Sequence, residues 1–139
     1  MIDPPFLLHA PMPAIELIIL LALLQYLVFG ALVGRAREAF KVQAPATTGH
    51  PLFERAYRVQ MNTLELLVVF LPALWLAARF WSPAWMAAVG ALWLVGRALY
   101  AVAYTQDPAR RALGFGLSLA SVGALLGLAG VGWLLQLVR

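Results

Sequence analysis

The chain contains no cysteine, and it has few charged residues for its length. Without cysteine there is no disulfide, no thiolate metal ligand and no cysteine nucleophile, so any thiol chemistry must use a thiol that a small molecule brings. Charged residues make up 12% of the 139 residues, and hydrophobic residues make up 63%. A soluble domain is about a quarter charged and about half apolar. The composition therefore indicates a membrane protein.

Four long apolar segments fill the chain. A helix that crosses a bilayer needs about 20 mostly apolar residues, because each backbone amide must find its hydrogen bond within the segment. The sequence offers four such segments, and we expect helices at about 13–34, 54–79, 83–104 and 108–138. The predicted fold class is an all-α membrane protein, in which residues 1–139 form a single domain, a four-transmembrane-helix bundle.

Local signals mark the ends and contacts of these helices. Ser82 and Asp107 each stand directly before a proline, which is typical of a helix N-terminus. Gly123 and Gly127 lie on one face of the fourth segment, where small residues favour close packing against another helix.

Basic residues are unevenly distributed among the loops, and short cytoplasmic loops are the ones that attract lysine and arginine. Seven of them surround the first and third loops: Arg35, Arg37, Lys41, Arg55, Arg58, Arg110 and Arg111. We therefore expect these two loops on the cytoplasmic side and both termini on the opposite side. The net charge of +4 then reflects topology, and no nucleic-acid-binding module is visible, so nucleic acid is not an expected partner.

Polar residues form a stripe along the second segment, at spacings of four, four and three. At about 100° per residue these positions share one helix face, and Gln60 points to nearly the opposite face. A charge near the centre of a bilayer costs at least about 2.5 kcal/mol on insertion scales, so it usually faces a partner or a cavity. The stripe consists of Glu54, Arg58, Asn62 and Glu65.

A second polar stripe runs along the third segment, through Arg97, Tyr100 and Tyr104. If the two stripes face each other, they form a polar cleft in which hydrogen-bond donors outnumber carboxylates, so an anionic guest would complete it. Arg110 and Arg111, expected in the first turn of the fourth helix, could stabilise such an anion together with the helix dipole.

Purely structural roles, which need no bound ligand, also remain open for these polar residues. Arg58 with Glu65, or Arg97 with Glu54, could form buried ion pairs that only hold the bundle together. Glu16 lies in the first turn of the first helix, where an acid complements the helix dipole. His9 and His50 are single histidines without a second ligand at metal spacing, so no metal is expected.

Three motifs in order along the chain resemble those of a known family. They are FERAYRVQMNTLE at 53–65, GRALYAVAY at 96–104 and ARRALGF at 109–115. With the TTG of the first loop, they resemble the signatures of the membrane-associated proteins in eicosanoid and glutathione metabolism, in particular bacterial members of the microsomal glutathione transferase type. The resemblance covers nearly the whole chain and is strongest from Arg35 to Phe115.

The resemblance implies a homotrimer with glutathione sites between subunits near the cytoplasmic face. Within one subunit, the residues that match glutathione-holding positions are Arg58, Asn62, Glu65, Tyr100 and Tyr104. Gln60 and Arg37 match contributions from the neighbouring subunit, and Arg97 matches an arginine that is structural or lines the site. Arg111 matches the arginine that activates the glutathione thiol.

The expected function is that of a membrane-bound glutathione S-transferase, with possible glutathione peroxidase activity, acting on lipophilic electrophiles or hydroperoxides. One alternative is a family member that presents lipid without catalysis, but that type has lost the arginine corresponding to Arg58. The retention of Arg58, Glu65 and Arg111 here favours an enzyme. A second alternative is a small multidrug transporter that uses Glu16.

Overall fold

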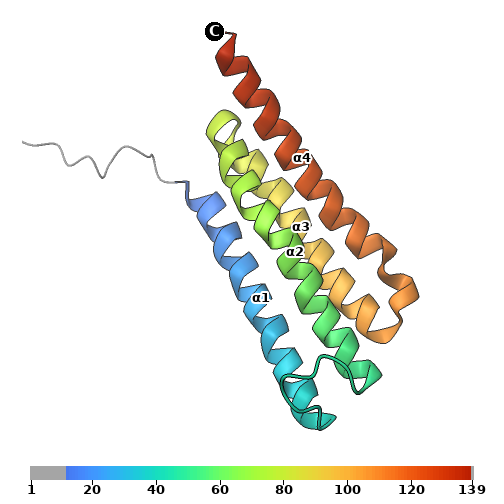
Figure 1. The fold of residues 1–139 in the computed structure, drawn as a ribbon. Helices are drawn as coiled ribbons and strands as arrows, with labels where there is room; N and C mark the ends of the chain where they lie inside the picture. The colour runs from blue at the N-terminus through green and yellow to red at the C-terminus, as the bar shows by residue number, and fades with distance from the viewer. Residues whose placement is uncertain (1–11, 139) are drawn as a thin grey trace, which may run out of the picture.

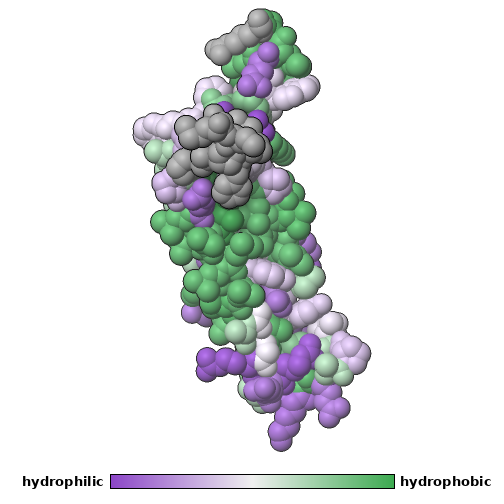
Figure 2. Space-filling model, turned by 90° about the vertical axis from the view of Figure 1, so that its left-hand side faces the viewer, coloured by the Kyte–Doolittle hydropathy of each residue, from purple (hydrophilic) through white to green (hydrophobic). Residues whose placement is uncertain are grey.

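A bundle of four long helices makes up the computed structural model, which describes residues 12–138 (Figure 1). The helices are α1 (Pro13–Ala39), α2 (Pro51–Phe80), α3 (Pro83–Gln106) and α4 (Ala112–Leu137), and a 3-10 turn, η2 (Pro108–Arg111), precedes α4. By length and composition, each of the four helices can cross a membrane. On the face that Figure 2 shows, hydrophobic residues form a band across the middle of the bundle. The chain is therefore an integral, multi-pass membrane protein.

The core lies where the four helices face one another. α2 and α3 contact each other, and both of them contact α1 and α4. At the centre, the rings of Phe70 and Trp93 stack with their centroids 4.2 Å apart, and neither side chain is exposed. Ile15 of α1 and Leu125 of α4 belong to the same buried cluster. All four helices therefore share one apolar core, which leaves their outer faces to the lipid.

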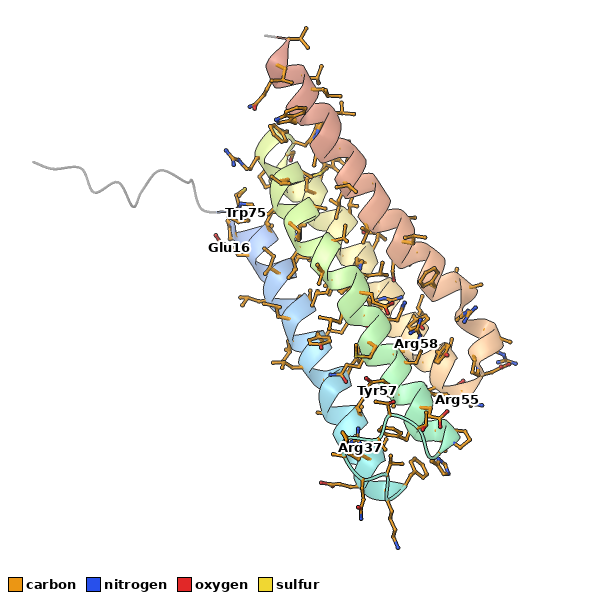
Figure 3. The ribbon with its side chains drawn as sticks, viewed as in Figure 1. Glu16, Arg37, Arg55, Tyr57, Arg58 and Trp75 are labelled. Atoms are coloured by element: carbon orange, nitrogen blue, oxygen red, sulfur yellow. The ribbon has the colours of Figure 1, made fainter. Side chains whose placement is uncertain are left out.

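One end of the bundle carries the α1–α2 loop and the connection from α3 to α4, and we call it the basic end. Arg37, Arg55 and Arg58 lie at this end, whereas Glu16 and Trp75 lie at the other (Figure 3). Figure 2 shows hydrophilic residues gathered at the same end. The two basic loops thus share one end of the bundle, as the positive-inside argument requires. That this end faces the cytoplasm stays a prediction.

α1, α2 and α3 extend further at the basic end than the hydrophobic pattern indicated, and the extension is largest in α1. α1 continues past its predicted end at Gly34 to Ala39. Hydropathy marks only the part of a helix that lies in the lipid, and the polar residues beyond it can continue the same helix in water. α2 begins at Pro51, where the Nδ1 atom of His50 accepts a hydrogen bond from the backbone N–H of Leu52. A polar cap therefore sets this helix start, and hydropathy does not register it.

Close packing between helices occurs at glycines other than the predicted pair. A Cβ atom on Gly114 would meet the backbone of Tyr100 and would lie 2.8 Å from the carbonyl oxygen of Gly96. A Cβ atom on Gly123 or Gly127 would meet nothing within 4 Å. The expectation that Gly123 and Gly127 mark a tight contact is therefore wrong within the chain. α4 crosses α3 at Gly114 and Gly96, because the bundle turns that face of α4 inward.

Candidate functional site

A groove of about 500 Å³ opens at the basic end, between α2, α3 and the start of α4. We call it the site groove. The seven residues that line it are Arg58, Asn62, Tyr100, Ala109, Arg111, Ala112 and Phe115. Two of them are cations and none is a carboxylate, so the lining is suited to an anion. Arg58 and Asn62 of the first predicted stripe and Tyr100 of the second therefore line one groove, and the other residues of the two stripes do not line it.

Glu65 stands beside the site groove as the partner of Arg58. The Nη1 atom of Arg58 lies 3.7 Å from the Oε1 atom of Glu65, and the two side chains are 55% and 53% exposed. This is one of the two ion pairs considered from the sequence, but it is not buried. A half-exposed pair can exchange its partner for a bound molecule at little cost, because exposed ion pairs contribute only about 0–1 kcal/mol.

The other ion pair considered, Arg97 with Glu54, does not form. The Oε1 atom of Glu54 accepts a hydrogen bond from the backbone N–H of Gly49 at 2.9 Å, which ties the α1–α2 loop to the first turn of α2. Glu54 therefore supports the loop at the basic end and does not line the site groove. The helical wheel had placed Glu54 on the polar stripe of the second segment. A carboxylate in the first turn of a helix can, however, also accept hydrogen bonds from backbone amides of the preceding loop.

Arg110 and Arg111 are adjacent, but the structure gives them different surroundings. Arg111 lines the site groove and is exposed. The Nε atom of Arg110 instead lies 3.6 Å from the Oδ2 atom of Asp107, on the surface. The sequence had suggested that both arginines lie in the first turn of an α-helix. In the structure they belong instead to the 3-10 turn η2. Asp107 caps this turn by accepting a hydrogen bond from the N–H of Ala109 at 3.0 Å.

Tyr100 and Tyr104 occupy consecutive turns of α3 beside the site groove. Their rings stack with centroids 5.3 Å apart, and Tyr100 is 3% exposed. Tyr100 lines the groove, whereas Tyr104 is half-buried, packs against Tyr100 and does not line the groove. The end of α3 is held to α2 by Arg55, whose Nη1 atom donates to the carbonyl oxygens of Thr105 and Gln106. The sequence had assigned Arg55 to topology alone.

Arg97 lies one layer behind the site groove and does not line it. Its side chain has no exposed surface, its Nε atom donates to the Oγ atom of Ser118, and its Nη1 atom donates to the Oδ1 atom of Asn62. Of the two roles that the sequence left open, the position of Arg97 favours a supporting one. Sequence reasoning missed Ser118 and Phe115, although their helical spacing from Arg111, seven and four residues, places them on the same side of α4.

Gln60 and Arg37 lie away from the site groove. The Nε2 atom of Gln60 lies against Gly30 of α1, 2.9 Å from where a Cβ atom would stand. The Nη1 atom of Arg37 donates to the carbonyl oxygens of Val42 and Ala46 in the α1–α2 loop. Both residues therefore belong to the α1–α2 side of the bundle, whereas the groove opens between α2 and α4.

Two further expectations concern residues outside the site groove. The Oε1 atom of Glu16 accepts a hydrogen bond from the N–H of Met12 at 3.4 Å, at the end of the bundle remote from the basic end (Figure 3). That contact is the helix-start role expected of an acid in the first turn. His9 lies outside the described residues. Within residues 12–138, no three histidine, aspartate or glutamate side chains form a group that could hold a metal ion.

The fold and the site define the class of protein: an integral membrane protein built as a four-helix bundle, with an arginine-lined groove at its basic end. The model of the MAPEG family matches residues 15–131, and the chain belongs to this family.

Three relatives illustrate what the chain is similar to. It is 53% identical over 115 residues to an uncharacterized protein of Synechocystis sp., with 79% of this chain and 84% of that protein covered. It is 39% identical to human microsomal glutathione S-transferase 2, with 73% of this chain and 69% of the relative covered. It is 36% identical to bovine leukotriene C4 synthase, with 83% and 77% covered.

Proposed function

We propose that this protein is a membrane-bound glutathione S-transferase whose thiol substrate binds in the site groove. The observation that carries the proposal is the convergence of Arg58, Asn62, Tyr100 and Arg111 on one groove that no carboxylate lines. Glutathione is an anionic thiol, and the name of the human relative, microsomal glutathione S-transferase 2, supports it as the thiol. The whole chain, residues 1–139, then acts as one four-helix domain with its basic end toward the cytoplasm.

The chemistry follows from the charge of the site groove. A free thiol has a pKa of about 8.5, and each unit by which a site lowers it raises the thiolate fraction at pH 7 by nearly tenfold. Arg111 is the group that would stabilise the thiolate, while Arg58, Asn62, Glu65, Tyr100 and Tyr104 hold the rest of the molecule. The thiolate attacks an electrophilic carbon, a C–S bond forms, and the leaving group departs with its electron pair.

The same thiolate can also reduce a lipid hydroperoxide. Two glutathione molecules give up two electrons and two protons, so that the hydroperoxide becomes an alcohol and water and the two thiols become one disulfide. The second reactant in either reaction is lipophilic, because the groove lies in a bundle that lipid surrounds. Such a reactant concentrates in the bilayer next to the groove.

We expect the detergent-purified protein to form a thioether from glutathione and a generic aryl halide, and to reduce a lipid hydroperoxide more slowly or not at all. The conjugate is measured by its absorbance. The matched control is a glutathione analogue whose thiol is replaced by a hydroxyl group, which should compete with glutathione without reacting. If glutathione binds but no electrophile or hydroperoxide is turned over, the protein is instead a lipid-presenting member of the family.

We also infer that the protein works as a homotrimer, in which Gln60 and Arg37 of one subunit complete the site groove of the next. Within one subunit these residues lie on the α1–α2 side, and the groove opens on the α2–α4 side, so a ring of subunits brings the two sides together. Native mass spectrometry should therefore show three copies.

Mixed assemblies test this arrangement more sharply. Arg58→Ala and Gln60→Ala subunits, when co-expressed, should regain activity that neither variant has alone, because some interfaces then join an intact Arg58 with an intact Gln60. Separately purified variants that are mixed after assembly are the control and should stay inactive. A monomer by mass, or co-expressed variants without any recovery, would contradict the trimeric site.

A further inference from the structure

Arg97 is a buried charge without a counter-ion. The side chain has no exposed surface, and within residues 12–138 the Nη2 atom finds no hydrogen-bond partner and no carboxylate lies within ion-pair distance of the guanidinium. Its Cζ atom stands 4.3 Å above the ring centroid of Tyr100. A guanidinium buried at membrane depth is costly unless its partners compensate it, so this position calls for a reason beyond packing.

The hydrogen bonds of Arg97 determine which way the Asn62 side-chain amide faces. A guanidinium can only donate, so the amide oxygen must turn toward it, and the Nη1 to Oδ1 distance is 2.9 Å. The amide nitrogen then points away from Arg97 and donates to the Oε2 atom of Glu65 at 3.1 Å. A flipped amide would direct its NH₂ group at the guanidinium and would lose both bonds.

Ser118 of α4 holds the other side of the guanidinium. Its hydroxyl donates to the carbonyl oxygen of Gly114 at 2.8 Å, which leaves a lone pair free to accept from the Nε atom of Arg97 at 3.0 Å. The close crossing of α3 and α4 at Gly96 and Gly114 permits this contact. The Nε atom of Arg97 is therefore held by α4, and its Nη1 atom donates to α2.

These contacts form one chain of polar groups across three helices. It runs from Ser118 through Arg97, Asn62 and Glu65 to Arg58, whose Nη1 atom lies 3.7 Å from the Oε1 atom of Glu65. This series of polar contacts starts in the core at Ser118 and ends at the site groove with Arg58. Direct contacts therefore link one buried amide to the carboxylate of Glu65 and through it to Arg58.

We propose that Arg97 is a positioning residue, which sets the Asn62 amide and thereby places Glu65 and Arg58 to receive the thiol substrate. The inference rests on the proposed function in that it assigns the groove to that substrate. Arg97 itself does not touch the bound molecule, because it lies behind Asn62 and does not line the groove. Its loss should weaken binding through Asn62, and the thiolate-stabilising group Arg111 should be left in place.

The first test needs no ligand. Asn62 is the only asparagine in the chain, so protein labelled with ¹⁵N-asparagine gives a single side-chain amide signal. In the protein in lipid bilayers, we expect one pair of amide proton signals, displaced from the shifts of a free asparagine side chain because both ends of the amide are hydrogen-bonded. Arg97→Met should move this pair toward the shifts of a free side chain or replace it by several pairs. Ser121→Ala is the matched control, because the Ser121 hydroxyl donates a part-buried hydrogen bond from α4 to the Val89 carbonyl oxygen of α3, and this bond does not lead to Asn62.

The second test measures coupling. Arg97→Met should raise the KM for glutathione by about tenfold, the size expected for one charge-assisted hydrogen bond, and should change kcat much less. In an Asn62→Ala background the same substitution should have no further effect on KM, because the residue through which it acts is gone. Arg97→Lys should recover part of the loss, and Ser121→Ala should leave KM unchanged.

The outcomes separate this inference from the proposed function. If wild-type protein neither binds nor uses glutathione, the proposed function fails, and the amide signal still decides the role of Arg97. If the amide signal of Arg97→Met matches that of the wild type, or if the effects of Arg97→Met and Asn62→Ala on KM are additive, the positioning role is overturned. An equal rise of KM in Ser121→Ala would also overturn it, since Arg97 would then be one of several general packing residues.

Discussion

Arg111→Ala should abolish most of the turnover while the protein stays folded and still binds glutathione. Arg111 is exposed, lines the site groove and makes no hydrogen bond or ion pair within residues 12–138, so its removal leaves no buried partner behind. A preorganised donor at the site of developing charge contributes about 10²–10³ to kcat. We expect a loss of that size, together with loss of the thiolate absorbance of bound glutathione near neutral pH.

Arg110→Ala is the control that the structure supplies. The two arginines contribute equally to the positive-inside rule, but Arg110 pairs with Asp107 on the surface and does not line the groove. Its substitution should leave the thiolate signal and the rate near those of the wild type. Equal losses in the two variants, or a normal thiolate signal in Arg111→Ala, would show that Arg111 does not activate the thiol.

Gly114→Ala should destabilise the protein more than any other single methyl group added to α4 near the groove. The new Cβ atom would meet the backbone nitrogen of Tyr100 and would lie 2.7 Å from its Cα atom and 2.8 Å from the carbonyl oxygen of Gly96. Backbone atoms of a packed helix cannot turn aside as a flexible side chain can. Overpacking of this kind costs about 1–3 kcal/mol or more.

The same substitution should also impair the site. Pushing α4 away from α3 lengthens the contact between Ser118 and Arg97, and it shifts Tyr100, which lines the groove. We therefore expect a lower melting temperature in detergent and weaker glutathione binding together. Gly116→Ala is the matched control, because a Cβ atom there meets nothing within 4 Å. A Gly114→Ala protein as stable as the Gly116→Ala protein would mean that the two helices do not cross closely at this point.

Several features could be predicted without any structure because they depend on composition and helical spacing alone. Four helices long enough to span a membrane follow from four long apolar segments. Arg58, Asn62 and Tyr100 meet in one groove because spacings of three and four keep residues on one face of a helix. Gln60 departs from that face by the same rule, and it lies against Gly30 of α1.

Other features depend on which helix faces which, and hydropathy does not carry that information. Four glycines of α4, at 116, 123, 127 and 130, face open space, whereas Gly114 and Gly132 lie against neighbouring helices. All six are glycines with nearly the same apolar neighbours in the sequence, so only the rotation of α4 in the bundle distinguishes them. The partners of Glu54 were predicted wrongly for a related reason, since a helical wheel does not show the amides of the adjoining loop.

The sequence by itself therefore determined that this protein spans a membrane with four helices and which polar residues share a helix face, because both depend on the chemistry and spacing of consecutive residues. Only the tertiary structure decided that Arg111 and not Arg110 enters the groove, and that Arg97 is buried against Asn62 and Ser118. The physical reason is that a charged side chain takes its role from the partners around it. Those partners come from other helices, whose depth and rotation are set by packing across the whole bundle.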